Sequence, residues 1–183
     1  MWLRVNAARG TRDDYRARLE AAGMESTACA FAPQALRLAR PVDVASLPGF
    51  AGGDVSVQDA AATLAPYFLA ARDGMRVLDA CAAPGGKACH VLELAPGVAE
   101  LVALDIDRTR TGRISANLTR LGLAALIVTG DAGNPAAWWD GRDYVAPPPG
   151  ADGAASLEAE ADDKPAKKAG EKPAEKKTAE PEA

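Results

Sequence analysis

The chain has 183 residues, 48% of them hydrophobic, and a formal net charge of −4 at pH 7. This length favours one domain or one and a fraction, and no apolar run is long enough to cross a membrane. The small net charge excludes a surface that is basic throughout, but it leaves room for a local basic patch. Three cysteines without CxxC spacing disfavour a disulfide framework or a metal site. Because no secretory pattern opens the chain, we expect a cytoplasmic protein.

The N-terminal region, residues 1–55, predicts a small α+β segment. Residues 1–6 alternate apolar and polar side chains, which is typical of a short strand. A helix is expected to begin after Thr11, which is followed three positions later by an acidic residue, and to end at Gly23. Residues 24–55 are rich in Pro and Gly, and we expect them to be mostly loop.

The next part of the chain alternates between helical and strand patterns. A first helix is expected over residues 55–70, with Pro66 interrupting it. Short apolar strands then alternate with helices, with strands at 75–79, 101–105 and 125–129 and helices at 86–94 and 108–121. This βαβαβ order predicts a parallel sheet covered on both faces. We therefore expect an α/β fold, a partial Rossmann-like domain over residues 56–145.

Residues 146–183 predict a disordered tail or insertion rich in Ala, Lys, Glu and Pro. From Ala151 to Ala183 there are six Lys and nine Asp or Glu, and Leu157 is the one large aliphatic residue. Such a composition cannot bury enough apolar surface to offset the entropy lost on ordering the chain.

Small and polar residues follow each predicted strand of the parallel sheet. The first strand leads into a loop made of Cys81, Ala82, Ala83, Pro84, Gly85, Gly86 and Lys87. Asp105 ends the second strand and Asp131 follows the third. Ligands of such sheets bind at the carboxyl ends of the strands, where a carboxylate suits ribose hydroxyls and another can accept a hydrogen bond from an adenine amino group. The sequence therefore predicts a pocket for an adenosine-containing molecule.

Each of these features also has a purely structural interpretation. Glycines after a strand are often turn residues, and an Asp at a strand end often caps the next helix. Lys87 is more informative, because residues 1–150 contain fourteen Arg and this single Lys. The P-loop pattern and the G-x-G-x-x-G pattern are both missing, so phosphate binding is not supported.

Three stretches carry a resemblance to a known family. In chain order, DACAAPGGKACH, LVALDIDRTRTGRISANLTRLGL and VTGDAGNPAAWW resemble the Sun/Fmu-type RNA cytosine-5 methyltransferases, with similarity from about Trp2 to Tyr144. The resemblance implies a Rossmann-like methyltransferase fold, S-adenosylmethionine as cofactor, and small-subunit ribosomal RNA as substrate. By that resemblance the loop from Cys81 to Lys87 would surround the methionine and ribose portion, Asp105 would hold the ribose hydroxyls, and Asp131 would lie near the adenine.

The resemblance also leaves the catalytic residues unassigned. Enzymes of this family attack cytosine C6 with a cysteine thiolate from an Asp-x-Pro-Cys motif, and a cysteine in a Thr-Cys motif assists release. Neither motif occurs in the 183 residues, nor does the helical RNA-binding domain that usually precedes WLRVN, so we expect a truncated part of the enzyme. We interpret Cys89 and His90 as a buried thiol and a helix-face histidine. Asp79 is expected to brace the loop, and Gln58 and Asp59 are weaker candidates for lining the pocket.

The first eighteen residues offer a candidate RNA face. Its members are five arginines and two aromatic residues: Arg4, Arg9, Arg12, Arg16, Arg18, Trp2 and Tyr15. The alternative is a solvated helix face with aromatic residues in the core. Three functions stay open: the cofactor-binding half of an RNA cytosine-5 methyltransferase, a catalytically inactive module that binds cofactor or RNA, and a nicotinamide-dependent oxidoreductase.

Overall fold

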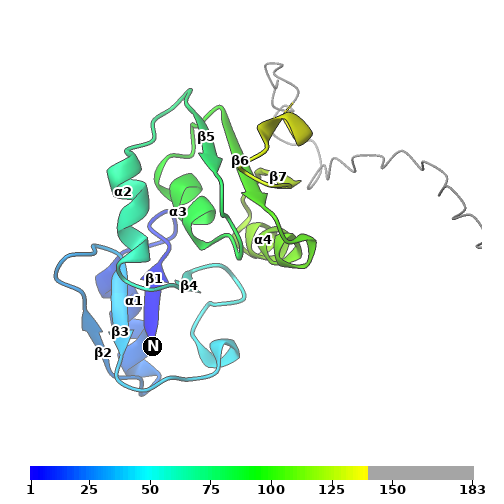
Figure 1. Ribbon diagram of the computed structural model, residues 1–183. Helices are drawn as coiled ribbons and strands as arrows, with labels where there is room; N and C mark the ends of the chain where they lie inside the picture. Colours follow the sequence, from blue (N-terminus) through cyan, green and yellow to red (C-terminus); the bar gives the residue numbers. More distant parts are fainter. Residues whose placement is uncertain (140–183) are drawn as a thin grey trace, which may run out of the picture.

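The computed structural model describes residues 1–139, which form two modules joined by a short helix (Figure 1). The first module contains β1 (Trp2–Val5), α1 (Arg12–Ala21), β2 (Ser26–Ala28), β3 (Ala35–Leu38) and β4 (Val55–Val57). The connecting helix is α2 (Ala65–Leu69). The second module contains β5 (Arg76–Asp79), α3 (Gly86–Leu94), β6 (Glu100–Asp105), α4 (Arg108–Leu121) and β7 (Leu126–Thr129). Short 3-10 helices lie at Val44–Ser46, Ala62–Leu64 and Pro135–Ala137. The expected disordered tail, residues 146–183, lies outside the described residues.

The first module is an antiparallel sheet with strand order β2-β3-β1-β4 and one covering helix. Leu3 and Val5 alternate along β1 and pack, with Tyr15 and Leu19 of α1, into one buried cluster. The side chain of Thr11 accepts a hydrogen bond from the backbone amide of the first helical turn and begins α1. The strand and helix predicted here are confirmed.

One prediction for the first module was wrong, and another missed short strands. Residues 24–55 are mostly loop, as expected, but β2, β3 and the start of β4 lie among them. The helix expected over 55–70 begins instead as strand β4. In each case pairing decides: β3 and β4 flank β1, where Leu3 lies opposite both Leu36 and Val57. Strands of three or four residues carry too little pattern of their own to be recognised before their partner is known.

The second module is a parallel sheet with order β5-β6-β7, and the predicted βαβαβ unit is confirmed. Both helices have the bounds expected from the sequence. Val77 and Ala103 pack on α3 and α4 in one core with Ile114 and Leu118. The predicted cover of both faces is met only in part, because α3 and α4 pack in one core with the same face of the sheet. On the opposite face Leu78 of β5 is 51% exposed, while its neighbour Val102 in β6 is 5% exposed. Right-handed crossovers that proceed in one direction across a sheet place both helices on the same face.

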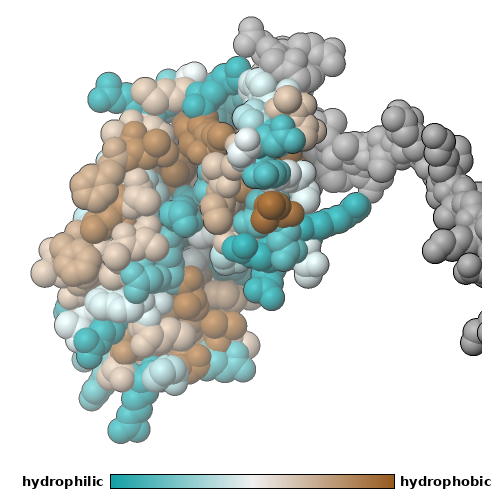
Figure 2. Space-filling view, in the orientation of Figure 1, coloured by the Kyte–Doolittle hydropathy of each residue, from teal (hydrophilic) through white to brown (hydrophobic). Residues whose placement is uncertain are grey.

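The connecting helix α2 has one side packed and one side exposed. Its inner side contacts α3. Phe68 and Leu69 are largely exposed, and Figure 2 shows apolar surface along the edge of the molecule where Figure 1 draws α2. Among residues 1–139, no helix is both long enough and apolar enough to span a membrane.

Candidate functional site

The candidate site lies at the carboxyl ends of the three parallel strands. Parallel pairing sets Asp79 of β5 beside Ala103 of β6, and Asp105 of β6 beside Thr129 of β7. The backbone amide of Gly130 then donates to the carbonyl oxygen of Asp105 at 3.0 Å. The fold thus gathers at one edge of the sheet the loop after β5, Asp105 and the turn that carries Asp131, as predicted from their order along the chain.

The loop between β5 and α3 is anchored to β6 through its backbone amides. The amide of Ala82 donates to the carbonyl oxygen of Leu104 at 2.9 Å. The next amide, that of Ala83, donates to the Oδ2 atom of Asp105 at 3.0 Å. Asp105 is 1% exposed, so this contact is shielded from water. The end of β6 therefore fixes the beginning of the loop.

The carbonyl oxygens of the same loop are held by side chains from α4 and β1. Arg110 donates to the carbonyl of Ala83 at 3.1 Å, and Asn117 donates to the carbonyl of Pro84 at 2.9 Å. Arg4 of β1 donates to the carbonyl of Gly86 at 2.7 Å. Because Arg110 and Asn117 are seven positions apart on one helix, both lie along the same face of α4. The loop thus has a fixed shape before any ligand arrives.

Helix α3 begins at this loop without a side-chain cap. Its N-cap is Gly85, at φ +100°, and no side chain there accepts a hydrogen bond from the first turn. The first backbone amides of an uncapped helix carry a partial positive charge and can donate to a carboxylate or another anion. Lys87 lies in this turn and is exposed. The arrangement is suited to a ligand that carries an anionic group.

The carboxyl group of Asp105 is ionised in the folded protein. Burial alone would raise its pKa. Hydrogen bonds from the backbone amides, those of Asp107 and Ala83 foremost, together with the charge of Arg110 outweigh that effect and bring the pKa below its ordinary value. The guanidinium of Arg110 acts in the same direction, with its Nη1 3.4 Å from Oδ1 of Asp105. A buried carboxylate of this kind can accept hydrogen bonds from hydroxyl groups.

Three further groups surround the site. The Oδ1 atom of Asp79 accepts a weak hydrogen bond from the amide of Cys81 at 3.4 Å, while its Oδ2 is buried and has no partner among the described residues. Ile106, directly after Asp105, presents a side chain that is 69% exposed. Asp131 accepts a hydrogen bond from the amide of Gly133 at 2.8 Å. The site therefore offers a free carboxylate oxygen and an apolar wall.

Cys89 and His90 lie inside α3 and are both buried. Burial raises the pKa of Cys89 to about 11, so its thiol is protonated at neutral pH. Burial, together with the positive charge of Arg4, lowers the pKa of His90 to about 3 and keeps its ring neutral. Neither side chain is placed to act as a nucleophile or a base toward a ligand at the strand ends.

The structure revises several of the residues singled out from the sequence. Arg4 is 0% exposed and Tyr15 is 2% exposed, so their place in the candidate RNA face was wrong. Both faces of strand β1 are buried, because one face packs against α1 and the other lies against α3. Gln58 contacts Arg4, and Asp59 caps a turn by accepting the amide of Ala61 at 2.8 Å.

Four residues hold the loop or α3 in a role that the sequence did not reveal: Arg4, Glu93, Arg110 and Asn117. The sequence could have indicated Arg110 and Asn117, because both are polar residues on the side of α4 that faces the loop. Glu93 carried a second signal as an acidic residue within an apolar helix face. Arg4 carried none, because the face to which it points depends on the second module.

Comparison with known families matches both modules. Residues 66–146 match the family described as 16S rRNA methyltransferase RsmB/F. Residues 1–45 match the ferredoxin-like domain of RsmF/B-like methyltransferases. The methyltransferase match thus corresponds to the second module, and the ferredoxin-like match corresponds to most of the first module.

Individual relatives agree with these matches. Ribosomal RNA small subunit methyltransferase B of Pseudomonas syringae pv. tomato is 50% identical over 144 residues, which are 79% of this chain and 32% of that protein. The protein of the same name from Vibrio cholerae serotype O1 is 52% identical over 144 residues, 79% of this chain and 33% of that protein. The chain therefore spans about a third of the length of these relatives. A crystal structure of a methyltransferase homologue from Pyrococcus horikoshii superposes with a TM-score of 0.66 at 27% identity, covering 74% of this chain and 45% of that one.

Proposed function

The chain belongs to the RsmB/F family of 16S rRNA methyltransferases, and we propose that its second module is the part of such an enzyme that binds S-adenosylmethionine. This cofactor supplies the methyl group. The observation that carries the proposal is the loop from Cys81 to Gly86, which is held by β6, α4 and β1 and leads into an uncapped helix beside a buried, ionised Asp105. A rigid loop with free amides and an adjacent carboxylate suits a zwitterionic nucleoside.

The residues present fit the cofactor's chemical groups one by one. The amides of the first turn of α3 suit the carboxylate of the methionine portion. Its ammonium group can be held by Oδ2 of Asp79, a buried carboxylate oxygen that has no partner among the described residues. Ile106 offers an apolar surface for the adenine ring, and Asp131 an acceptor for its amino group. We therefore propose Cys81 to Lys87, Asp105 and Asp131 as the residues that bind the cofactor.

Asp105 is proposed to hold the ribose hydroxyls. Its carboxylate is covered by Arg110, whose side chain is 44% exposed and therefore has space to move outward. Each carboxylate oxygen accepts about two hydrogen bonds, so Asp105 can keep the amide of Ala83 and still accept from a hydroxyl. We infer that the ribose takes the position of the Arg110 guanidinium at this carboxylate.

The reaction of the whole protein is proposed to be methylation of cytosine C5 in small-subunit ribosomal RNA. The names of the relatives support ribosomal RNA of the small subunit as substrate. The choice of C5 follows from the family resemblance of the loop and strand motifs. Within the 183 residues, our assignment is limited to cofactor binding, because the Asp-x-Pro-Cys and Thr-Cys motifs of the family do not occur there. Two members of the candidate RNA face, Arg16 and Arg18 of α1, are exposed and therefore remain available for contact with RNA.

Isothermal titration calorimetry of the 183-residue chain tests this function. We expect it to bind S-adenosylhomocysteine and not NAD. Asp105→Ala should weaken binding by about 1.5–3 kcal/mol, the usual cost of lost hydrogen bonds to a charged group, which is tenfold or more in Kd. Asp13→Ala, on the exposed side of α1, is the control and should bind like the wild type. Equal affinity of a folded Asp105→Ala chain would contradict the site, and binding of NAD alone would contradict the function.

A further inference from the structure

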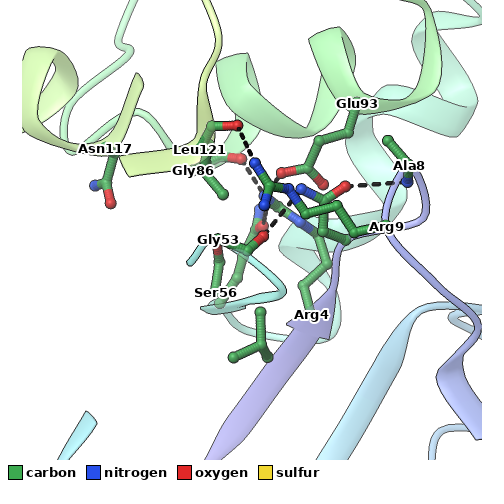
Figure 3. Close-up of polar contacts among 12 residues, drawn as sticks. Arg4, Ala8, Arg9, Gly53, Ser56, Gly86, Glu93, Asn117 and Leu121 are labelled. Carbon is green, nitrogen blue, oxygen red and sulfur yellow. Dashed lines mark hydrogen bonds and ion pairs between the residues drawn. The ribbon is translucent and has the colours of Figure 1, made fainter. Parts of the chain in front are cut away.

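The first module reaches the candidate site through the buried side chain of Arg4, beside which Gln58 also lies near Gly86. Arg4 extends from β1 to α3, and it is the largest fully buried side chain among the described residues. Its Nη2 atom donates to Oε1 of Glu93 at 2.6 Å, and its Nη1 donates to the carbonyl oxygen of Gly86 at 2.7 Å and to Gln58. Figure 3 shows the guanidinium between Glu93 and Gly86. One charged group thus joins the first module to both the beginning and the end of α3.

Stability alone is a weak reason for this arrangement. The side chains of Arg4 and Glu93 are 0% and 1% exposed, so both charges have lost their hydration. Replacing a buried ion pair by apolar side chains of similar volume is often neutral or stabilising. The Nε atom of Arg4 and Oε2 of Glu93 have no partner among the described residues, which adds to the cost. A role beyond holding the modules together is therefore worth seeking.

The position of the loop supplies such a role. Pro84 and Gly86 line a cavity of about 210 Å³ between the modules, which Arg4, Asn117 and Arg120 also line. The rear of the loop is therefore not completely packed against side chains. Asn117 and Arg4 cross this region and bind the carbonyls of Pro84 and Gly86. Where the cavity leaves the loop unpacked, these polar contacts hold it, in addition to the packing of Gly85 against Ile114.

We propose that Arg4 is a positioning residue for the cofactor site, through which the ferredoxin-like module holds the first turn of α3 in its binding geometry. The inference rests on the proposed function, because it concerns the same site. Arg4 acts on the carbonyl of Gly86 and thereby on the direction of the neighbouring amides. For residues that orient metal ligands, substitution commonly costs 10–100-fold in metal affinity, and we expect an effect at the lower end of that range for a residue that orients these amides.

A double substitution separates positioning from stability. Arg4→Met leaves Glu93 buried without its partner, so that variant alone is expected to be destabilised. Arg4→Met combined with Glu93→Leu removes both charges at similar volume and should restore the urea midpoint of the wild type. We expect this double variant to bind S-adenosylhomocysteine about tenfold more weakly than the wild type. Its loop, residues 80–89, should also exchange amide hydrogens faster in the absence of ligand.

Arg9→Met is the matched control. Arg9 also links the two modules, donating to the carbonyl oxygens of Gly52 and Leu121, but it does not contact the loop. This variant should bind S-adenosylhomocysteine with unchanged affinity and show unchanged exchange in residues 80–89. Figure 3 shows both arginines at the same interface.

The outcomes distinguish the two proposals. A stable double variant with wild-type affinity and wild-type exchange overturns the positioning role and leaves the proposed function intact. A wild-type chain that binds no S-adenosylhomocysteine overturns the proposed function, and the inference is overturned with it. An Arg9→Met chain that loses affinity as strongly as the double variant also overturns the role of Arg4, because any damage to the interface would then suffice.

Discussion

Gly85 lies so close to Ile114 that a Cβ atom on the glycine would come within 3.3 Å of the Cα atom of Ile114. Gly85 is also at φ +100°, a conformation that residues with a side chain rarely adopt. Two causes, contact with α4 and backbone conformation, therefore require glycine where the loop enters α3.

Gly85→Ala should destabilise the chain by about 1–3 kcal/mol, because the new Cβ is strained in both respects. Binding of S-adenosylhomocysteine should weaken as well, since the first turn of α3 must shift. The matched control is Gly112→Ala within α4, where a Cβ would meet nothing within 4 Å. That substitution should stabilise by about 0.5–1 kcal/mol. Urea unfolding measures both, and equal effects of the two would contradict the close contact.

Arg110→Ala tests whether the ribose displaces the guanidinium from Asp105. Because Arg110 competes for the carboxylate, its removal should leave binding of S-adenosylhomocysteine as tight as in the wild type or tighter. The lost contact to the carbonyl of Ala83 is one of several that hold the loop. Calorimetry at fixed ionic strength measures the affinity. A loss as large as that of Asp105→Ala would show that Arg110 supports the ligand rather than competing with it.

His90 should make the stability depend on pH between about 3 and 6.5. The unfolded chain takes up a proton at the ordinary histidine pKa of 6.5, while the folded chain does so only at about 3. Stability is therefore full above pH 6.5 and falls as the pH is lowered, by up to about 1.4 kcal/mol per pH unit.

Urea unfolding of the wild type and of His90→Leu, at several pH values between 4.5 and 7.5, isolates this effect. The chain has a single histidine, so the difference between the two stabilities reports on that residue alone. It should change with pH below 6.5 and be constant above. If the stability difference between the two proteins did not change with pH, His90 would take up a proton in the folded chain as readily as in the unfolded chain.

Sequence alone was sufficient for the order and bounds of the elements in the second module. The apolar strands, the helix boundaries and the order of the polar residues are local properties, and right-handed parallel crossovers then bring the strand ends to one edge. Asp105 and the loop after β5 could thus be placed at one site without coordinates. The predicted end of the helix at residue 121 was equally local, because the next residue, Gly122, adopts φ +70° and ends α4.

Only the tertiary structure decided the first module and its contact with the site. Strands β2, β3 and β4 exist because β1 and its neighbours complete their hydrogen bonds, which a three-residue pattern cannot reveal. The same holds for Arg4, which resembles a surface arginine in the sequence and is buried because α3 supplies Glu93 and the carbonyl of Gly86. A charge can leave water only where partners replace its hydration, and those partners are 82 and 89 positions away along the chain.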